Sequence, residues 1–283
     1  MLIKTPDFSL ADTLTAGQTF CWNLGENENT WNGWIQGNYC CLKQKSPTQL
    51  IMSGSGLNSD DIRAYLGLND DPMAILQPYF EGNQVLKEAV TKTRQLRCVQ
   101  EPWWECTANF ICSSLKQIPH IRQLNTTLRE RFGDTQNEGI SYTYPHWSRI
   151  ARIDEEDLRR CRLGYRAKFL LGTARMIENG QFDPNRISNM ETEEASNYLQ
   201  RLPGVGEKIA HCILLYAWRR FDAFPIDVWI ARAMHTLYFK QKKMPPHSKI
   251  HLKSRRLFGA HRGLAQLHLF HWTRVQGNRH KAS

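Results

Sequence analysis

Long apolar runs are missing from the chain, and so is an export signal. No stretch of about eighteen consecutive apolar residues occurs, which is the length that a membrane-spanning helix needs. The first residues, MLIKTPDFSLADTL, contain an acid and a proline where a signal peptide has its apolar core. We therefore expect a protein that neither crosses a membrane nor is secreted.

Cysteine pairs with the spacing of a redox or metal motif are also missing. The eight cysteines stand singly, apart from Cys40 and Cys41, and none follows Cys212. Without a C-x-x-C pair, the sequence gives no sign of a disulfide framework. We expect reduced thiols, each packed as a small apolar side chain.

Basic residues, in contrast, are in excess. The 283 residues include 37 Lys and Arg against 27 Asp and Glu, which gives a formal net charge of +10. Such a charge favours a polyanionic partner, either nucleic acid or an anionic membrane surface. A basic protein without such a partner is the alternative. The length leaves room for two or three domains.

The order of local patterns predicts an α+β fold. Residues 18–24, 30–44 and 48–56 are rich in aromatic and β-branched residues, with a turn expected at Gly37 and Asn38, and they indicate an N-terminal antiparallel sheet. Helical spacing begins near Asp60 and dominates after Glu101. We expect a sheet domain with flanking helices over residues 1–100, packed on a mostly helical body over residues 101–283.

The segment LPGVG, between two helical patterns, predicts a helix–hairpin–helix at about residues 193–219. Gly204 and Gly206 permit positive φ and close approach to a ligand. Together with Val205, they lead into a helix whose first amide groups form a cradle for a DNA phosphate. A plain turn between two helices is the alternative.

Lys208 stands in the first turn of the second helix, where the helix dipole disfavours a positive charge. An amine that has lost its proton is a nucleophile. Asp227 precedes another apolar helix and suits a helix N-cap. If the two side chains meet, the amine can attack the anomeric carbon of a sugar while the carboxylate stabilises positive charge. A lysine that binds phosphate and an aspartate that only caps a helix are the alternatives.

These residues resemble the helix–hairpin–helix–GPD superfamily of DNA glycosylases, and within it the 8-oxoguanine DNA glycosylase/AP lyase family. The segments that carry the resemblance follow one another in order from Gly17 to Phe270: GQTFCW, FICSS, LGYRAKF, LPGVGEKIAHC, PIDV and LAQLHLF. The resemblance implies that Lys208 is the nucleophile and Asp227 the catalytic carboxylate. It also implies that the Gly17 carbonyl accepts the N7 hydrogen of 8-oxoguanine.

The same resemblance assigns the base pocket and the groups that open the duplex. Gln266 would bind the Watson–Crick edge of the extruded base, and Phe270 and Cys212 would enclose its ring. Tyr165 would enter the gap in the duplex, and Arg166 would hydrogen-bond the orphaned partner base. Extrusion is needed because C1′ cannot be attacked inside the stack. Core packing is the alternative for Tyr165, Phe270 and Cys212.

The resemblance also sets expectations for partners and cofactors. Backbone carbonyls of Gln200, Leu202 and Val205 match positions that can hold a structural monovalent or divalent cation beside the phosphate. We expect no cofactor for catalysis, and no iron–sulfur cluster because the C-terminal cysteine ligands are missing. The expected partner is double-stranded DNA with an oxidised purine, bound by a monomer in a bacterial nucleoid or a eukaryotic nucleus.

Some residues depart from the family pattern. Leu115, in CSSLKQ, stands where the family has an asparagine, and His120 stands where it has an arginine. A leucine can enter the duplex but cannot donate a hydrogen bond. We therefore predict a relaxed preference for the opposite base. Trp229 replaces a histidine that follows the catalytic aspartate, which leaves phosphate binding there open.

Two other functions remain as alternatives. A glycosylase for another damaged purine, such as an alkylated one, is the first, although relatives of that kind usually lack the hairpin lysine. A non-catalytic DNA-binding protein that uses the hairpin only for phosphate is the second. Covalent trapping distinguishes a glycosylase/lyase, which forms a DNA adduct through Lys208, from a binding module, which forms none.

Overall fold

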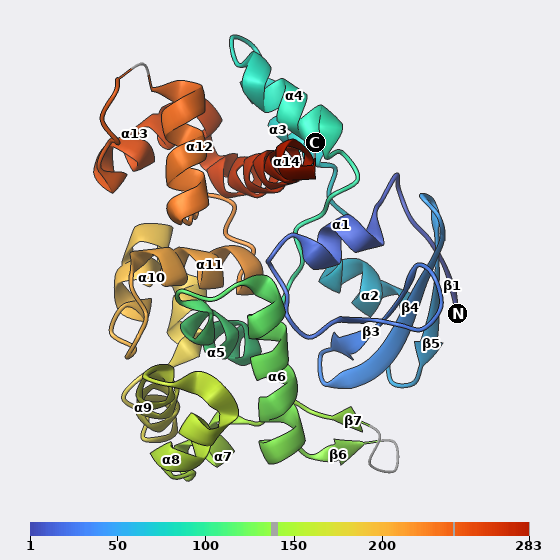
Figure 1. Ribbon diagram of the computed structural model, residues 1–283, viewed down its shortest axis with the longest axis vertical. Helices are drawn as coiled ribbons and strands as arrows, with labels where there is room; N and C mark the ends of the chain where they lie inside the picture. Colours follow the sequence, from blue (N-terminus) through green and yellow to red (C-terminus); the bar gives the residue numbers. More distant parts are fainter. Residues whose placement is uncertain (137–140, 240, 283) are drawn as a thin grey trace.

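The computed structural model describes residues 1–136, 141–239 and 241–282, with side chains of the last helix described up to residue 275. Its N-terminal part is a five-stranded antiparallel sheet in the order β1-β5-β4-β3-β2 (Figure 1). The strands are β1 Leu2–Lys4, β2 Asn23–Leu24, β3 Thr30–Ile35, β4 Asn38–Ser46 and β5 Gln49–Gly54. The predicted α+β class, with its N-terminal antiparallel sheet and helical body, is confirmed.

The hairpin between β3 and β4 turns one residue earlier than expected. Ile35 pairs with Asn38, so Gln36 and Gly37 form the turn rather than Gly37 and Asn38. Both turn residues have positive φ, 49° and 79°. A two-residue turn of this kind matches the right-handed twist of the strands, so the turn conformation is set by hairpin geometry even though Gln36 is not glycine.

A separate apolar core lies under the sheet. It joins the inward side chains of the strands to α1 Leu10–Thr15 and α2 Ser59–Tyr65, with fully buried Trp22, Leu42 and Tyr65 among its members. The Asn58 side chain caps α2 in a complete capping box with Asp61, which fixes where this helix starts.

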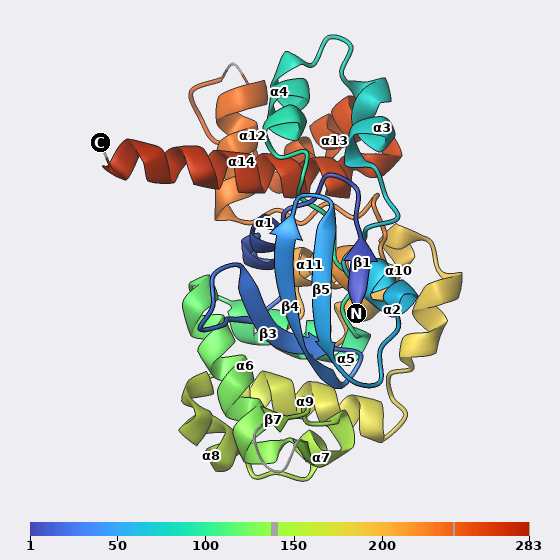
Figure 2. The same ribbon diagram turned by 90° about the vertical axis from the view of Figure 1, so that its right-hand side faces the viewer.

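The rest of the molecule is a helical body (Figure 2). Its buried apolar side chains form one core. Its main helices are α3 Pro72–Leu76, α4 Gln84–Lys92, α5 Trp103–Ser113, α6 Ile118–Phe132, α9 Arg166–Glu178, α10 Thr192–Leu199, α11 Glu207–Ala217, α12 Val228–Tyr238, α13 His247–Phe258 and α14 Arg262–Ala282. Smaller elements are α7 Trp147–Ala151, α8 Glu155–Leu158, β6 Thr135–Gln136, β7 Ser141–Tyr142, a π turn Arg159–Leu163 and 3-10 turns Gln77–Tyr79, Pro184–Asn189 and Gly259–His261. Within the described ranges, no helix combines the length and apolar character needed to cross a bilayer.

The boundary between the two apolar cores does not fall at residue 100 of the chain. The sheet core ends at Leu68, while Leu76 and Leu86, from α3 and α4, belong to the helical core, where α4 packs against α14. Ala16 and Phe20 also belong to the helical core, although they precede β2. The loop between α1 and β2 thus reaches from the sheet region into the helical body, and the domain boundary at residue 100 stays a prediction.

Candidate active site

The helix–hairpin–helix is formed by α10, a tight turn and α11. Gly204 has φ +80°, and a Cβ there would lie 2.7 Å from the Cβ of Phe169, so only glycine fits. Gly206 does not use positive φ, contrary to expectation: its φ is −96°, and it serves as the N-cap of α11 without a side-chain hydrogen bond. Because no side chain caps α11 there, its first amide groups are free to bind an anion.

Lys208 is the second residue of α11 and is half-buried. Its Nζ lies 5.3 Å from the centroid of the Phe110 ring, and the Cys212 thiol lies one helical turn further on. Burial raises the pKa of the Cys212 thiol to about 11, so this thiol stays protonated beside the amine. The Phe110 ring and the neutral Cys212 thiol are therefore only weak interaction partners for the amine.

Asp227 caps α12, as its sequence position indicates. Its Oδ1 accepts a hydrogen bond of 2.7 Å from the amide of Ile230, which fixes the orientation of the carboxylate. Asp227 and Lys208 both line one cavity of about 620 Å³. The structure thus brings together the two side chains for which the sequence predicts a joint chemical role.

The cavity lies where six segments meet. Its walls come from the loop before β2, the end of α5, the start of α6, the starts of α11 and α12, and α14. The lining residues include Gly17, Phe20, Phe110, Ser113, Lys116, Ile118, Arg122, Lys208, Asp227, Trp229, Phe270 and Arg274. Aromatic walls suit a planar ring, while Asp227 stands among four basic side chains. Lys116, Arg122 and Arg274 were not anticipated from the sequence as cavity residues.

Gly17 is held against the cavity by its neighbour Gln18. The buried Gln18 side chain donates to the carbonyls of Thr13 and Arg97 at 2.9 and 2.7 Å, and accepts from the amide of Val99 at 3.0 Å. Gly17 has φ +83°, and a Cβ there would lie 3.6 Å from the Phe270 ring. The expected strand over residues 18–24 is therefore wrong, because only Asn23 and Leu24 pair as β2.

The other predicted base-pocket residues differ in exposure. Phe270 is half-buried on the cavity wall, whereas Gln266 and Cys212 are buried and do not line this cavity. Gln266 precedes Phe270 by one turn of α14, so both lie on one helix face. The Oε1 atom of Gln266 is buried and has no hydrogen-bond partner among the described residues. An unsatisfied buried acceptor is costly, which makes it suited to a donor that arrives with a ligand.

The predicted wedge residues stand outside the cavity. Leu115 is 94% exposed with φ +55°, and Tyr165 is 42% exposed at the residue before α9. Arg166 is only 6% exposed, and its guanidinium donates to the carbonyls of Ser114 and Leu163. Its expected contact with an orphaned base stays a prediction.

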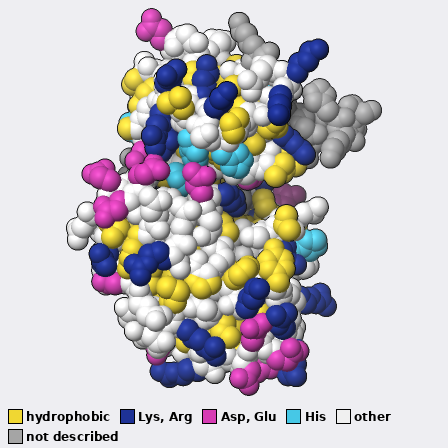
Figure 3. All heavy atoms as spheres, turned by 90° about the vertical axis from the view of Figure 1, so that its left-hand side faces the viewer, with side chains coloured by type: hydrophobic (Ala, Val, Ile, Leu, Met, Phe, Trp, Pro, Cys, Tyr) yellow, Lys and Arg dark blue, Asp and Glu magenta, His cyan; other side chains and the backbone are white. Residues whose placement is uncertain are grey.

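A second hollow of about 810 Å³ adjoins the cavity and shares Lys116, Pro119 and Arg122 with it. His120 is exposed there, beside Arg160 and Arg162, so the hollow is basic. Figure 3 shows one face of the molecule hollowed at mid-height, with Lys and Arg side chains above and below the hollow and His, Asp and Glu side chains along its upper edge. Positive charge along a groove is the arrangement that attracts a phosphate backbone.

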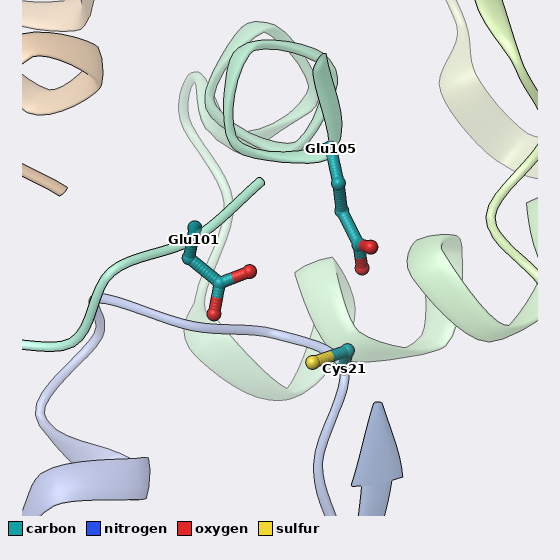
Figure 4. Close-up of side chains that lie close together, drawn as sticks. All are labelled: Cys21, Glu101 and Glu105. Carbon is teal, nitrogen blue, oxygen red and sulfur yellow. The ribbon is translucent and has the colours of Figure 1, made fainter. Parts of the chain in front are cut away.

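A different group of buried ionisable side chains lies at the other end of α5. The ligand-type atoms of Cys21, Glu101 and Glu105 converge within 4.8 Å of one another (Figure 4). Tyr65 donates to Glu101 at 2.6 Å, and Arg129 donates to Glu105 at 2.5 Å. Burial, and then the Glu105 charge, raise the pKa of Glu101 to about 7. Because these carboxyl groups already have donors, the cluster forms a hydrogen-bonded polar core.

The hairpin with its lysine and aspartate defines a class of base-excision proteins. Residues 109–259 match the family model described as "HhH-GPD superfamily base excision DNA repair protein". Residues 1–107 match the one described as "8-oxoguanine DNA glycosylase, N-terminal domain". The chain therefore belongs to the 8-oxoguanine DNA glycosylase/AP lyase family of that superfamily.

Solved structures agree over nearly the whole chain. A structure described as MBOgg1 in complex with a low-affinity DNA ligand is 30% identical, with a TM-score of 0.90 over 98% of this chain and 96% of that one. The 8-oxoguanine glycosylase/lyase of Clostridium acetobutylicum, in complex with DNA containing cytosine opposite 8-oxoguanine, is 27% identical, with a TM-score of 0.87 over 98% of both chains.

Among the curated relatives, a probable N-glycosylase/DNA lyase of Methanothermobacter thermautotrophicus is 39% identical over 125 residues. That match covers 43% of this chain and 38% of the relative, so the chain matches less than two thirds of that relative's length.

Proposed function

We propose that this protein is a bifunctional DNA glycosylase/AP lyase that removes 8-oxoguanine from duplex DNA and then cuts the strand. The observation that carries the proposal is the convergence of Lys208 and Asp227 on one cavity of about 620 Å³, at the N-terminal end of the hairpin's second helix. Family membership and the basic charge of the chain support it.

In the first chemical step, the amine nitrogen of Lys208 attacks C1′ of the damaged nucleotide. The new N–C1′ bond forms as the C1′–N9 bond breaks, and the base leaves with that electron pair and takes up the proton that the attacking nitrogen loses. The Asp227 carboxylate stabilises the positive charge that develops on the sugar. Its hydrogen bond to the Ile230 amide keeps it in place for this role.

In the second step, the sugar ring opens and leaves an imine between Lys208 and C1′. Loss of a proton from C2′ then breaks the C3′–O3′ bond and releases the 3′ phosphate, which cuts the strand. Water hydrolyses the imine and regenerates the amine. A covalent intermediate of this kind is what an amine nucleophile offers over direct attack by water.

Recognition of the oxidised base is assigned to the cavity walls. The Gly17 carbonyl accepts the N7 hydrogen that 8-oxoguanine has and guanine lacks, so an intact guanine would leave that acceptor unpaired. The buried, unpartnered Oε1 of Gln266 supports its role as an acceptor for the Watson–Crick edge. Phe270 on one side and Cys212 on the other would enclose the ring, which requires Cys212 to become accessible from its buried position.

DNA binding is assigned to the hairpin and the wedge residues. Backbone groups of Gly204, Val205 and Gly206 and the first amides of α11 would hold one phosphate. Leu115 and Tyr165 are exposed and apolar, as insertion into the base stack requires. Phosphate contacts of this kind make binding fall steeply as salt rises.

A structural cation is a secondary element of the proposal. The carbonyls of Gln200, Leu202 and Val205 belong to one turn, and backbone oxygens are ligands that hard cations accept. The Leu202 carbonyl already accepts a hydrogen bond of 3.1 Å from the Val205 amide, and its second lone pair fits a cation. We assign no catalytic cofactor, and we place the protein as a monomer on chromosomal DNA.

Relaxed selection of the opposite base is also proposed. Leu115 cannot donate a hydrogen bond, and three N–H groups of Arg166 already donate to protein carbonyls. Excision rates with cytosine, adenine, guanine or thymine opposite 8-oxoguanine should therefore lie within about tenfold of one another, since direct readout needs free donors or acceptors. Strong selectivity for cytosine in a single-turnover assay would contradict this.

The proposed function is tested by borohydride trapping on a panel of lesions. Wild type should form a covalent adduct with 8-oxoguanine DNA, and Lys208→Gln should form none while still binding the lesion. Lys116→Gln, at the other lysine of the cavity wall, is the matched control and should still be trapped. An adduct with alkylated purines but not with 8-oxoguanine would favour the first alternative. Binding without any adduct would favour a non-catalytic module.

A further inference from the structure

Arg166 joins two segments that are far apart in the sequence. It is the first residue of α9, and its Nε donates to the Ser114 carbonyl at 2.9 Å, at the C-terminal end of α5. Nη2 donates to the same carbonyl, and Nη1 donates to the Leu163 carbonyl at 3.3 Å. The guanidinium carbon also lies 4.4 Å from the centroid of the Tyr165 ring. One side chain thus contacts the wedge residue Tyr165 and the residue that precedes the wedge residue Leu115.

The backbone at Leu115 needs such support. A leucine at φ +55° is unfavourable, because its Cβ crowds the following carbonyl oxygen. Strained residues of this kind persist only where their surroundings hold them. On the N-terminal side of Leu115, Arg166 grips the Ser114 carbonyl, and beyond it the Lys116 amide donates to the Ser113 carbonyl at 3.1 Å. With Leu115 94% exposed, the loop has little packing of its own.

We propose that Arg166 is a positioning residue that holds Leu115 and Tyr165 at a fixed separation, so that both side chains enter the duplex together during base extrusion. This inference rests on the proposed function, and it changes the role that the family resemblance implies for Arg166. A guanidinium suits this task because its planar fork can bond two carbonyls and stack on a ring at once.

The hydrogen bonds of Arg166 to protein carbonyls also argue against recognition of the partner base as the main role of this residue. A guanidinium has five N–H groups, and three of those in Arg166 donate to protein carbonyls. The side chain is 94% buried, so contact with an orphaned base would require these bonds to break. A positioning role uses them as they stand.

The first test measures single-turnover excision with each of the four bases opposite 8-oxoguanine. Arg166→Ala should slow extrusion, reported by 2-aminopurine beside the lesion, by roughly ten- to hundredfold, which is the usual effect of losing a charged hydrogen bond. The loss should be equal for all four opposite bases. Lys168→Ala, which removes one exposed positive charge of the same helix, is the control for lost phosphate attraction. A loss concentrated on one opposite base would overturn the inference.

The second test is a double-mutant cycle with Leu115→Ala. If Arg166 acts through the wedge loop, the two losses should overlap, and the double variant should be at most about twofold slower than the slower single variant. Millimolar guanidinium should partly restore Arg166→Ala, in comparison with sodium chloride at the same ionic strength. If the two losses in rate multiply in the double variant and guanidinium does not restore Arg166→Ala, Arg166 and Leu115 act independently.

A third measurement separates this inference from the proposed function. Hydrogen exchange of the amides of residues 115 and 116 in the free protein should become faster in Arg166→Ala and stay unchanged in Lys168→Ala. This readout needs no catalysis. If wild type forms no adduct, the proposed function fails although the exchange result stands. If wild type is trapped but exchange is unchanged in Arg166→Ala, the positioning role fails and the enzyme assignment survives.

Discussion

Two groups of ionisable side chains lie toward opposite ends of α5, and they differ in how their charges are satisfied. Toward the N-terminal end, Glu101 and Glu105 are buried, with a tyrosine and an arginine bound to them. Toward the C-terminal end, Phe110 and Ser113 line a cavity that contains the half-buried Lys208 and Asp227. The first group is closed by its own partners, while the second faces a space large enough for a ligand.

The comparison shows why a perturbed pKa alone does not locate a reaction centre. Burial raises the pKa of Glu101 to about 7 and raises that of Cys21 strongly, yet neither group lines the cavity with Lys208. Structural networks shift pKa values by the same desolvation that active sites use. What distinguishes the cavity is that an amine and a carboxylate converge on open space.

The largest effect on stability is expected when buried Glu105 loses its ion-pair partner. Arg129→Met removes the cation that pairs with buried Glu105, and an uncompensated buried charge costs about 3–5 kcal/mol of unfolding free energy. Arg94→Met is the matched control, because its ion pair with Asp7 is exposed and should contribute less than about 1 kcal/mol. Urea denaturation measures both. Equal losses in the two variants would mean that the buried pair has no special structural role.

A substitution of Asp227 in the cavity should change the activity of the protein and not its stability. Asp227→Asn keeps an oxygen that accepts from the Ile230 amide, so the helix cap should survive. It removes the negative charge, and base excision should fall by about 10²–10³-fold, as expected for a lost electrostatic stabiliser. Single-turnover excision and thermal unfolding are compared for the same preparation. If excision is retained, Asp227 only caps its helix.

The sequence predicts the parts of the site that depend on local patterns. The hairpin, the Asp227 cap and the placement of Lys208 in the first helical turn all follow from residues close to one another in the chain. The resemblance adds Gly17 and Phe270, which line the same cavity. These features carry signals within a few residues, so they can be found without coordinates.

The parts that escaped prediction depend on contacts between distant segments. Residues 18–24 have strand propensity, but the hydrogen bonds that Gln18 donates to the Arg97 carbonyl and accepts from the Val99 amide impose an irregular loop instead. The hold of Arg166 on Ser114 joins segments 52 residues apart. Helix α13 was not anticipated, because its sequence follows a pair of prolines and carries many basic residues. In each case tertiary contacts decide the structure.

The smallest expected effect is a change of stability with pH that is caused by buried Glu101. Glu101 is an acid whose folded pKa, about 7, exceeds its ordinary value of 4.5, so its contribution to stability is complete below pH 4.5 and is lost as pH rises through 7. Glu101→Gln never ionises and should be more stable than wild type at pH 8 by about 1–3 kcal/mol, with the difference vanishing toward pH 4.5. Buried His211 and His268, whose pKa values are lowered to about 3, destabilise both proteins alike in acid and cancel in the difference. Urea denaturation of both proteins between pH 4.5 and 8 measures this difference in unfolding free energy. If the difference does not change with pH, Glu101 ionises as an ordinary carboxyl group in the folded protein.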